Sequence, residues 1–234
     1  MKSYVKFDIK MYSSIIVIVL SAFISNIFAA EYCYSEVVGA CSPVDNVMEN
    51  CNAKYGGIDD TMKELQNYVN LQINRNWQFL LLSVHFANYE TNRPGFTELH
   101  KSYADTLWND AIDEIKHITK RGGHMDFFYK KKNPNQAEID NYDVTELASL
   151  GKAIDLWKSV AEEGHYIHRE STRRHDKLHD PEVASHIENK YVHKHADIIR
   201  DLSGNINELK VMLNKIEDSN VALFLFDNFL KKMK

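Results

Sequence analysis

The chain has 234 residues, of which 44% are hydrophobic and 26% charged, so it is long enough for one sizeable domain and too apolar for a disordered chain. Nine glycines and four prolines are few for this length, which argues against a turn-rich sandwich or barrel and favours long helices. The formal charge of −5 argues against nucleic acid as a partner, because binding a phosphate backbone requires a basic face.

Residues 1–30 have the pattern of a secretory signal peptide. A short basic stretch at 1–10 precedes an apolar run at 15–20, and Ala29 and Ala30 supply small residues at a cleavage point. The alternative is an uncleaved membrane anchor, which the shortness of the apolar run disfavours. We therefore expect a protein that is secreted or held in the secretory lumen, with no membrane partner.

All three cysteines, Cys33, Cys41 and Cys51, fall in an irregular extension expected at 31–58. Cysteines in an oxidising lumen form disulfides, and an odd number leaves one over after an intrachain bridge. The sequence leaves three intrachain pairings open and predicts an intermolecular disulfide through the remaining cysteine. A zinc site is disfavoured, because the next histidine, His85, is far along the chain.

From residue 59 onward, apolar residues recur every three or four positions, which is the spacing of one helix face. A first helix is expected to start near Asp59, and a second at Pro94. Gly122 and Gly123 end the second helix. The expected core positions of these two helices are Met62, Leu65, Val69, Ile73, Trp77, Leu80, Val84 and Ala87, then Phe96, Leu99, Tyr103, Leu107, Ala111, Ile115 and Ile118.

A polar connection at about 124–142 is too long for a helix hairpin and would make the third helix parallel to the second. Asp143 is expected to cap the third helix, and Asp180 the fourth. A short apolar fifth helix at 221–230 needs a partner to cover it. The expected core positions are Leu147, Leu150, Ile154, Trp157 and Ala161, then Ala184, Ile187, Tyr191, His195, Ile198, Leu202, Ile206, Leu209 and Leu213.

Five short motifs occur in order along these helices: Asn70–Leu71, Asp110–Ala111, Arg121–Gly123, Asp180–Pro181 and Leu223–Asp227. Together with the helix lengths, the secretory signal and the early cysteines, they resemble the ferritin family, in particular the light-chain type of secreted insect ferritins. The resemblance implies an all-α, ferritin-like four-helix bundle at 59–234, with a long crossover between the second and third helices. It also implies a hollow 24-mer shell that stores iron as a ferric mineral and contains a heavy-chain subunit as partner.

Heavy chains of this family carry a di-iron ferroxidase centre made of three Glu, one His and one Gln. The matched positions in this chain are Gln72, Leu107, Asp110, Trp157 and His195. All five differ, one acid remains, and a tryptophan would fill space that metal occupies. We therefore predict that the chain is not an enzyme. A single ion at Asp110, His195 and Gln72, or a hydrogen-bonded polar cluster, remains open as an alternative.

The resemblance further implies two surfaces that handle iron. Glu98 and Asp105 match positions that light-chain ferritins use for mineral nucleation, although Lys101 lies on the same face; an ordinary solvated helix face is the alternative. Pores of this family are lined by the start of the fourth helix, where Ser185 and Glu188 match two acids. For Glu188 the alternative is a surface salt bridge.

Seven of the 11 histidines lie between residues 165 and 195, and most are expected on the surface. Two pairs, His165 with His168 and His175 with His179, have a spacing at which they could share a metal.

The sequence thus favours a storage subunit that depends on a heavy chain for Fe(II) oxidation. A secreted four-helix binding or signalling protein is the alternative. It is disfavoured because no cysteine ties the helices together and because an apolar fifth helix has no use in a monomer.

Overall fold

The computed structural model describes residues 36–37, 50–127, 144–173 and 179–232. Its contacts divide the chain into two units, Met1–Asn52 and Ala53–Lys234. The predicted signal peptide at 1–30, Cys33 and Cys41 lie outside the described residues.

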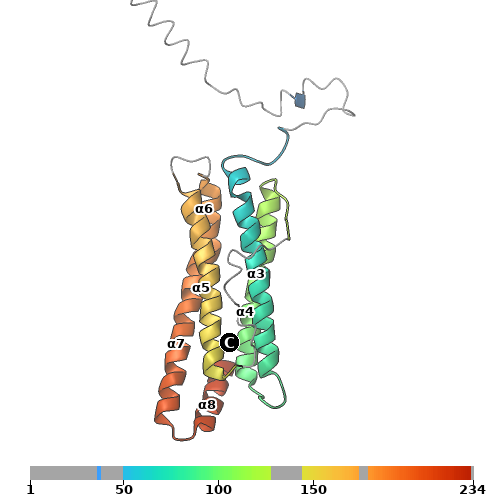
Figure 1. Cartoon of the computed structure of the whole chain (residues 1–234). Helices are drawn as coiled ribbons and strands as arrows, with labels where there is room; N and C mark the ends of the chain where they lie inside the picture. Colours follow the sequence, from blue (N-terminus) through green and yellow to red (C-terminus); the bar gives the residue numbers. More distant parts are fainter. Residues whose placement is uncertain (1–35, 38–49, 128–143, 174–178, 233–234) are drawn as a thin grey trace, which may run out of the picture. The chain divides into compact units, whose positions relative to one another are not determined.

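The second unit contains long helices, as the periodicity predicted. They are α3 (Ile58–Phe86), α4 (Pro94–Lys120), α5 (Glu146–Ser171), α6 (Pro181–Ile187), the π-helical segment η1 (Glu188–Val192), α7 (His193–Lys215) and α8 (Ser219–Lys232). Figure 1 shows α3 beside α4, and α5 beside the helix formed by α6, η1 and α7. The short α8 lies at the lower end of the bundle in this view. The predicted all-α bundle with a short fifth helix is therefore confirmed.

The direction of α5 follows from contacts at both ends of the long connection. Side-chain amides of Gln66 and Asn70, one turn apart on α3, donate to the carbonyls of His124 and Asp126 at 2.7 and 2.8 Å. The chain leaving α4 therefore runs back along α3. At the far end, Arg93, just before α4, pairs with Glu146 at the start of α5 at 2.8 Å. Because α4 and α5 start at the same end of the bundle, they are parallel, as predicted.

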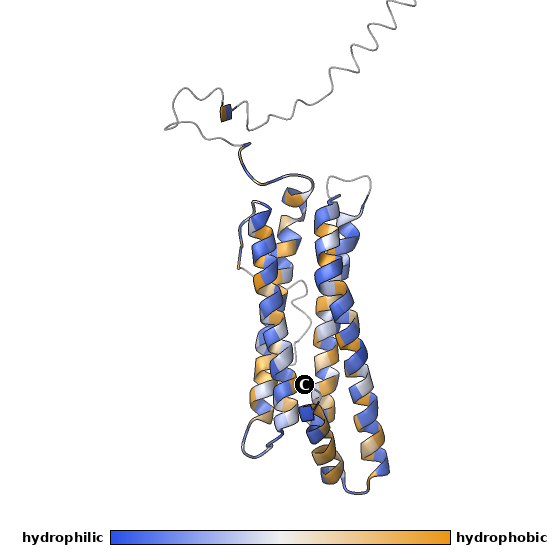
Figure 2. Cartoon of the chain, turned by 180° about the vertical axis from the view of Figure 1, so that it is seen from behind, coloured by the Kyte–Doolittle hydropathy of each residue, from blue (hydrophilic) through white to orange (hydrophobic). Residues whose placement is uncertain are grey.

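The core lies between the helices. Figure 2 shows hydrophobic and hydrophilic residues alternating along each long helix, as expected for helices with one buried face. On α3 the expected stripe is wrong at three positions in its second half, whereas Leu80 packs against the core. Trp77, Val84 and Ala87 are exposed, and Trp77 retains 62% of its surface. The buried face instead runs through polar positions such as Gln72 and Asn76. The Asn76 amide is accommodated because it donates to the carbonyl of Ala104 at 2.7 Å.

The first turns of α5 and α6 are each capped by a side-chain oxygen that accepts hydrogen bonds from backbone N–H groups. Asp180 caps α6, as predicted, and accepts from the backbone N–H groups of Glu182 and Val183 at 3.1 and 3.2 Å. Asp143, the predicted cap of α5, lies outside the described residues. Thr145 caps α5, because the helix begins at Glu146. Among the described residues, no helix combines the length and apolar character that crossing a membrane requires.

Candidate functional site

The five positions matched to a ferroxidase centre all lie in the bundle core. Gln72, Leu107, Trp157 and His195 are at most 1% exposed, and Asp110 is 7% exposed. The rings of Trp157 and His195 are 5.4 Å apart. They come from α5 and α7, so this part of the interior is filled by aromatic side chains.

Asp110 is the single carboxylate among these five positions, and it is already neutralised. Its Oδ1 accepts a short hydrogen bond from the ammonium of Lys194, one residue before His195 on α7. Burial raises the pKa of Asp110, and the bond from Lys194 opposes this only in part. A metal ion bound by Asp110 would therefore have to compete with this ammonium group.

Several polar atoms in this region have no hydrogen-bond partner within the described part of the chain. Both side-chain polar atoms of Gln72, both ring nitrogens of His195 and the indole nitrogen of Trp157 are in this state. Burial lowers the pKa of His195 to about 4, so its ring is neutral at physiological pH. Buried groups of this kind are commonly satisfied by ordered water.

A second polar cluster, which the sequence analysis missed, lies at the end of the bundle where α4 ends and α6 begins. In the described part of the chain, only Glu114, His117 and His186 bring three metal-ligating side chains within 4.8 Å. Glu114 and His117 are three residues apart on α4, a Glu-x-x-His spacing seven residues beyond Leu107 and Asp110. That spacing was the available signal, because residues i and i+3 share a helix face.

The Glu114 carboxylate joins the two histidines. Oε1 accepts from His117 Nδ1 at 3.1 Å, and Oε2 accepts from His186 Nε2 at 3.0 Å. The two imidazoles are stacked, with centroids 3.8 Å apart and planes 10° apart. Burial by itself would raise the pKa of Glu114, but the bonds from both histidines hold it below its ordinary value.

The other side of His117 faces α6. Its Nε2 donates to Glu182 at 3.0 Å, and Glu182 is also bound by Arg121. Burial opposes protonation of His117, but the two carboxylates raise its pKa. Arg121 continues the network to Asp180 at 2.8 Å.

The predicted nucleation and pore residues lie on the surface. Asp105 is exposed and pairs with Lys101 at 3.0 Å, while Glu98 is half-buried on the same helix. Glu188 is exposed, with His168 Nε2 at 3.6 Å and His193 Nε2 at 4.0 Å.

The remaining predicted sites are placed as follows. Ser185 is exposed and accepts from the Asn189 amide at 3.1 Å. His165 and His179 are exposed, and His175 lies outside the described residues. The expectation of surface histidines is wrong for His195, which is buried in the core, and for His186, which is partly buried in the cluster described above.

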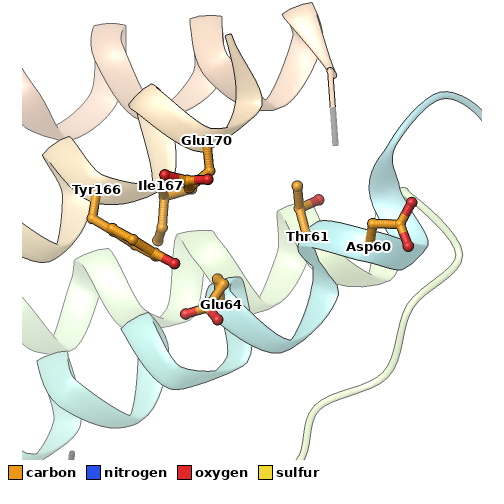
Figure 3. A pocket seen from close by; sticks show the side chains of 6 residues that line it. All are labelled: Asp60, Thr61, Glu64, Tyr166, Ile167 and Glu170. Atoms are coloured by element: carbon orange, nitrogen blue, oxygen red, sulfur yellow. The ribbon is translucent and has the colours of Figure 1, made fainter. Parts of the chain in front are cut away.

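A hollow of about 230 Å³ between α3 and α5 is lined by three carboxylates, those of Asp60, Glu64 and Glu170 (Figure 3). Glu170 is paired with Arg169 at 3.2 Å and with Arg173 at 2.9 Å. These arginines offset its charge, so the hollow is less anionic than its lining suggests.

Comparison with known proteins shows the same fold and related sequences over most of the chain. A ferritin light chain from Trichoplusia ni is 39% identical over 218 residues, which cover 89% of this chain and 94% of that protein. A ferritin light chain from Drosophila melanogaster is 35% identical over 205 residues, covering 86% and 90%. The crystal structure of Trichoplusia ni secreted ferritin matches with a TM-score of 0.79 and 37% identity, over 88% of this chain and 100% of that chain. No family model matches the sequence. The identity and coverage of these relatives establish that this chain belongs to the ferritin family.

Proposed function

We propose that this chain is a light-chain-type, non-catalytic subunit of a secreted ferritin, a 24-mer that stores iron as a ferric mineral. The observation that carries the proposal is the replacement of the metal-binding core by an aromatic side chain and an ion pair. Trp157 occupies the interior, and Lys194 neutralises Asp110. The relatives named above as light chains support the same division of labour.

Oxidation of Fe(II) would then take place on a heavy-chain subunit of the same shell. A di-iron centre requires several carboxylates and a histidine that converge on open space. Gln72, Leu107 and Trp157 supply no carboxylate, and His195 is held next to an indole instead. Iron is therefore cargo for this subunit and not a resident catalyst.

Glu98 and Asp105 on α4 are the proposed contact with the growing mineral, because hard carboxylate oxygens bind ferric ions. Asp105 forms an exposed salt bridge with Lys101. Asp105 can therefore bind a ferric ion only when it releases that lysine. Glu188 is the proposed pore residue. It is exposed, and the Nε2 atoms of His168 and His193 lie 3.6 and 4.0 Å from its carboxylate.

The heavy chain is the proposed covalent partner. Cys51 is disulfide-bonded, and the chain's other two cysteines, Cys33 and Cys41, lie outside the described residues. With three cysteines in the chain, one of Cys33 and Cys41 remains for a bridge to a different subunit. Non-reducing electrophoresis of the secreted protein should give a light–heavy dimer, and a reductant should separate it into monomers. Migration as a monomer alone would refute this pairing.

The experiment that tests the proposed function is a measurement of native mass and iron content on the secreted protein. We expect iron to co-elute with a particle of 24-mer size that contains both chains. Purified light chains supplied with Fe(II) should oxidise it no faster than buffer, and adding heavy chains should restore oxidation. A small iron-free species would favour the secreted binding or signalling protein instead. Oxidation by light chains alone would contradict the non-catalytic assignment.

A further inference from the structure

We propose that Glu114, His117 and His186 form a binding site for one divalent transition-metal ion, such as Zn(II) or Fe(II). The site is distinct from the five altered ferroxidase positions and does not depend on the proposed storage function. Its three ligand atoms would be one Glu114 oxygen, His117 Nδ1 and His186 Nε2. Two imidazoles and one carboxylate are a ligand set that both of these ions accept.

The spacing of these atoms suits an ion. Bonds of about 2.1 Å at angles between 90° and the tetrahedral value separate neighbouring ligand atoms by about 3.0–3.4 Å. The two N···O distances from Glu114 are already 3.1 and 3.0 Å. These two contacts are made to different oxygens of the carboxylate, and all three ligand atoms lie within 4.8 Å of one another. Because the two rings are stacked, they would have to turn toward one another for both nitrogens to reach the same ion. On binding, the proton on His117 Nδ1 would leave to solvent, and His186 would carry its ring proton on Nδ1, which frees Nε2 for the ion.

The surroundings of His117 have the form that metal-binding histidines usually show. Its second nitrogen, Nε2, donates to Glu182, and Arg121 holds Glu182 in turn. A carboxylate in this position fixes the ring with Nδ1 toward the ion and makes the ring a stronger ligand. Glu182 is therefore a positioning residue in the proposed site.

Charge and access also favour an ion. Glu114 has a fully buried side chain, so its negative charge is held away from water. A bound dication would neutralise the carboxylate while both rings stay uncharged. The His186 side chain is 17% exposed, which gives an ion a path from the α6 side.

The direct test uses the metal-free, assembled secreted protein with its partner subunit. Crystals soaked in Zn(II) should show an anomalous difference peak about 2.0–2.2 Å from His117 Nδ1, His186 Nε2 and a Glu114 oxygen. Zinc bound at surface histidines with no peak at these three residues would overturn the proposal, and the cluster would then be a hydrogen-bonded network only.

Titration calorimetry with Zn(II) on the same assembly gives a second readout. His186→Gln should remove one bound ion per light chain, whereas His193→Gln, an exposed histidine on α7, should leave the number unchanged. Glu182→Gln should keep the ion but weaken its binding about 10- to 100-fold. Equal stoichiometry in the two histidine variants, with native mass and helix content unchanged, would overturn the site. If a variant fails to fold, the crystallographic test still decides the proposal, because it uses the unmodified protein.

Discussion

Arg121 stabilises the end of the bundle where α4 stops and α6 begins. Its side chain is 2% exposed, and its guanidinium bonds both Asp180 and Glu182. It also donates to the Tyr55 carbonyl at 2.8 Å. One buried cation thus joins α4, the start of α6 and the segment before α3. Removing it would leave a buried carboxylate without its counter-charge, which is costlier than losing an exposed pair.

We expect Arg121→Leu to lower the free energy of unfolding by about 3–5 kcal/mol. The matched control is Arg200→Leu, which removes an 82% exposed arginine paired with Asp201 and should cost less than about 1 kcal/mol. Denaturant unfolding monitored by circular dichroism measures both. Equal losses in the two variants would show that burial of the pair does not matter.

The same network predicts a pH dependence. Burial alone would raise the pKa values of Asp180 and Glu182, but the bonds from Arg121, with that from His117 to Glu182, hold them below their ordinary values of 3.8 and 4.5. A lowered carboxyl pKa adds stability above the ordinary value and loses it as the pH falls through the lowered one. The stability gap between the native chain and Arg121→Leu should therefore be full at neutral pH and shrink below about pH 4. Unfolding midpoints measured across that range test this, and a constant gap would contradict it.

At the scale of the elements, α8 is attached to the start of α4. Asp227 on α8 accepts from the backbone N–H of Phe96 at 3.1 Å, so its carboxylate binds a free N–H group in the first turn of α4. Gly95 makes the close approach possible. A Cβ at this position would lie 2.0 Å from the carbonyl oxygen of Asp227, a contact that the backbone of α8 would have to relieve.

Gly95→Ala should therefore push α8 away from α4 and destabilise the chain by about 1–3 kcal/mol. Backbone hydrogen exchange should become faster in α8 of this variant, with a smaller change in α5. Gly151→Ala is the control: it lies inside α5 with nothing within 4 Å of its Cβ and should be neutral or stabilising by up to about 1 kcal/mol. Unchanged exchange in α8 of the Gly95 variant would be evidence against the close contact.

The helix α3 shows how the spacing of apolar residues can predict the wrong buried face. On α3 the spacing of apolar residues continued onto the outer face through Trp77 and Val84, while Gln72 and Asn76 took the buried positions. A period of three or four residues does not distinguish these faces when both carry apolar side chains. Asn76 is satisfied by a carbonyl of α4, and that partner is known only from the packed structure.

At the scale of the whole molecule, α8 retains an uncovered apolar face. Figure 2 shows the helix largely in the hydrophobic colour. The exposed side chains are Val221, Phe224, Leu225 and Phe229. An exposed patch of this kind marks a contact with another protein chain, which fits a shell subunit.

We expect Phe224→Asp to reduce shell assembly, because it places a charge in a face that assembly would bury. Phe224 is 60% exposed, so the folded subunit itself should keep its helix content. Asn220→Asp, exposed on the same helix, is the control and should assemble normally. Light scattering after size separation gives the native mass. Full-size shells from the Phe224 variant would mean that α8 is not buried in the assembly.

The sequence by itself determined the number, order and direction of the long helices, because helix periodicity, caps and terminating glycines are local properties of the chain. Motif positions also led to the altered ferroxidase residues, which all lie in the core. The tertiary structure alone decided the partners of those residues. Lys194 reaches Asp110 across 84 positions, and His186 reaches Glu114 across 72. Such pairs depend on how the faces of separate helices are rotated against each other, and the packing of the whole bundle fixes that rotation.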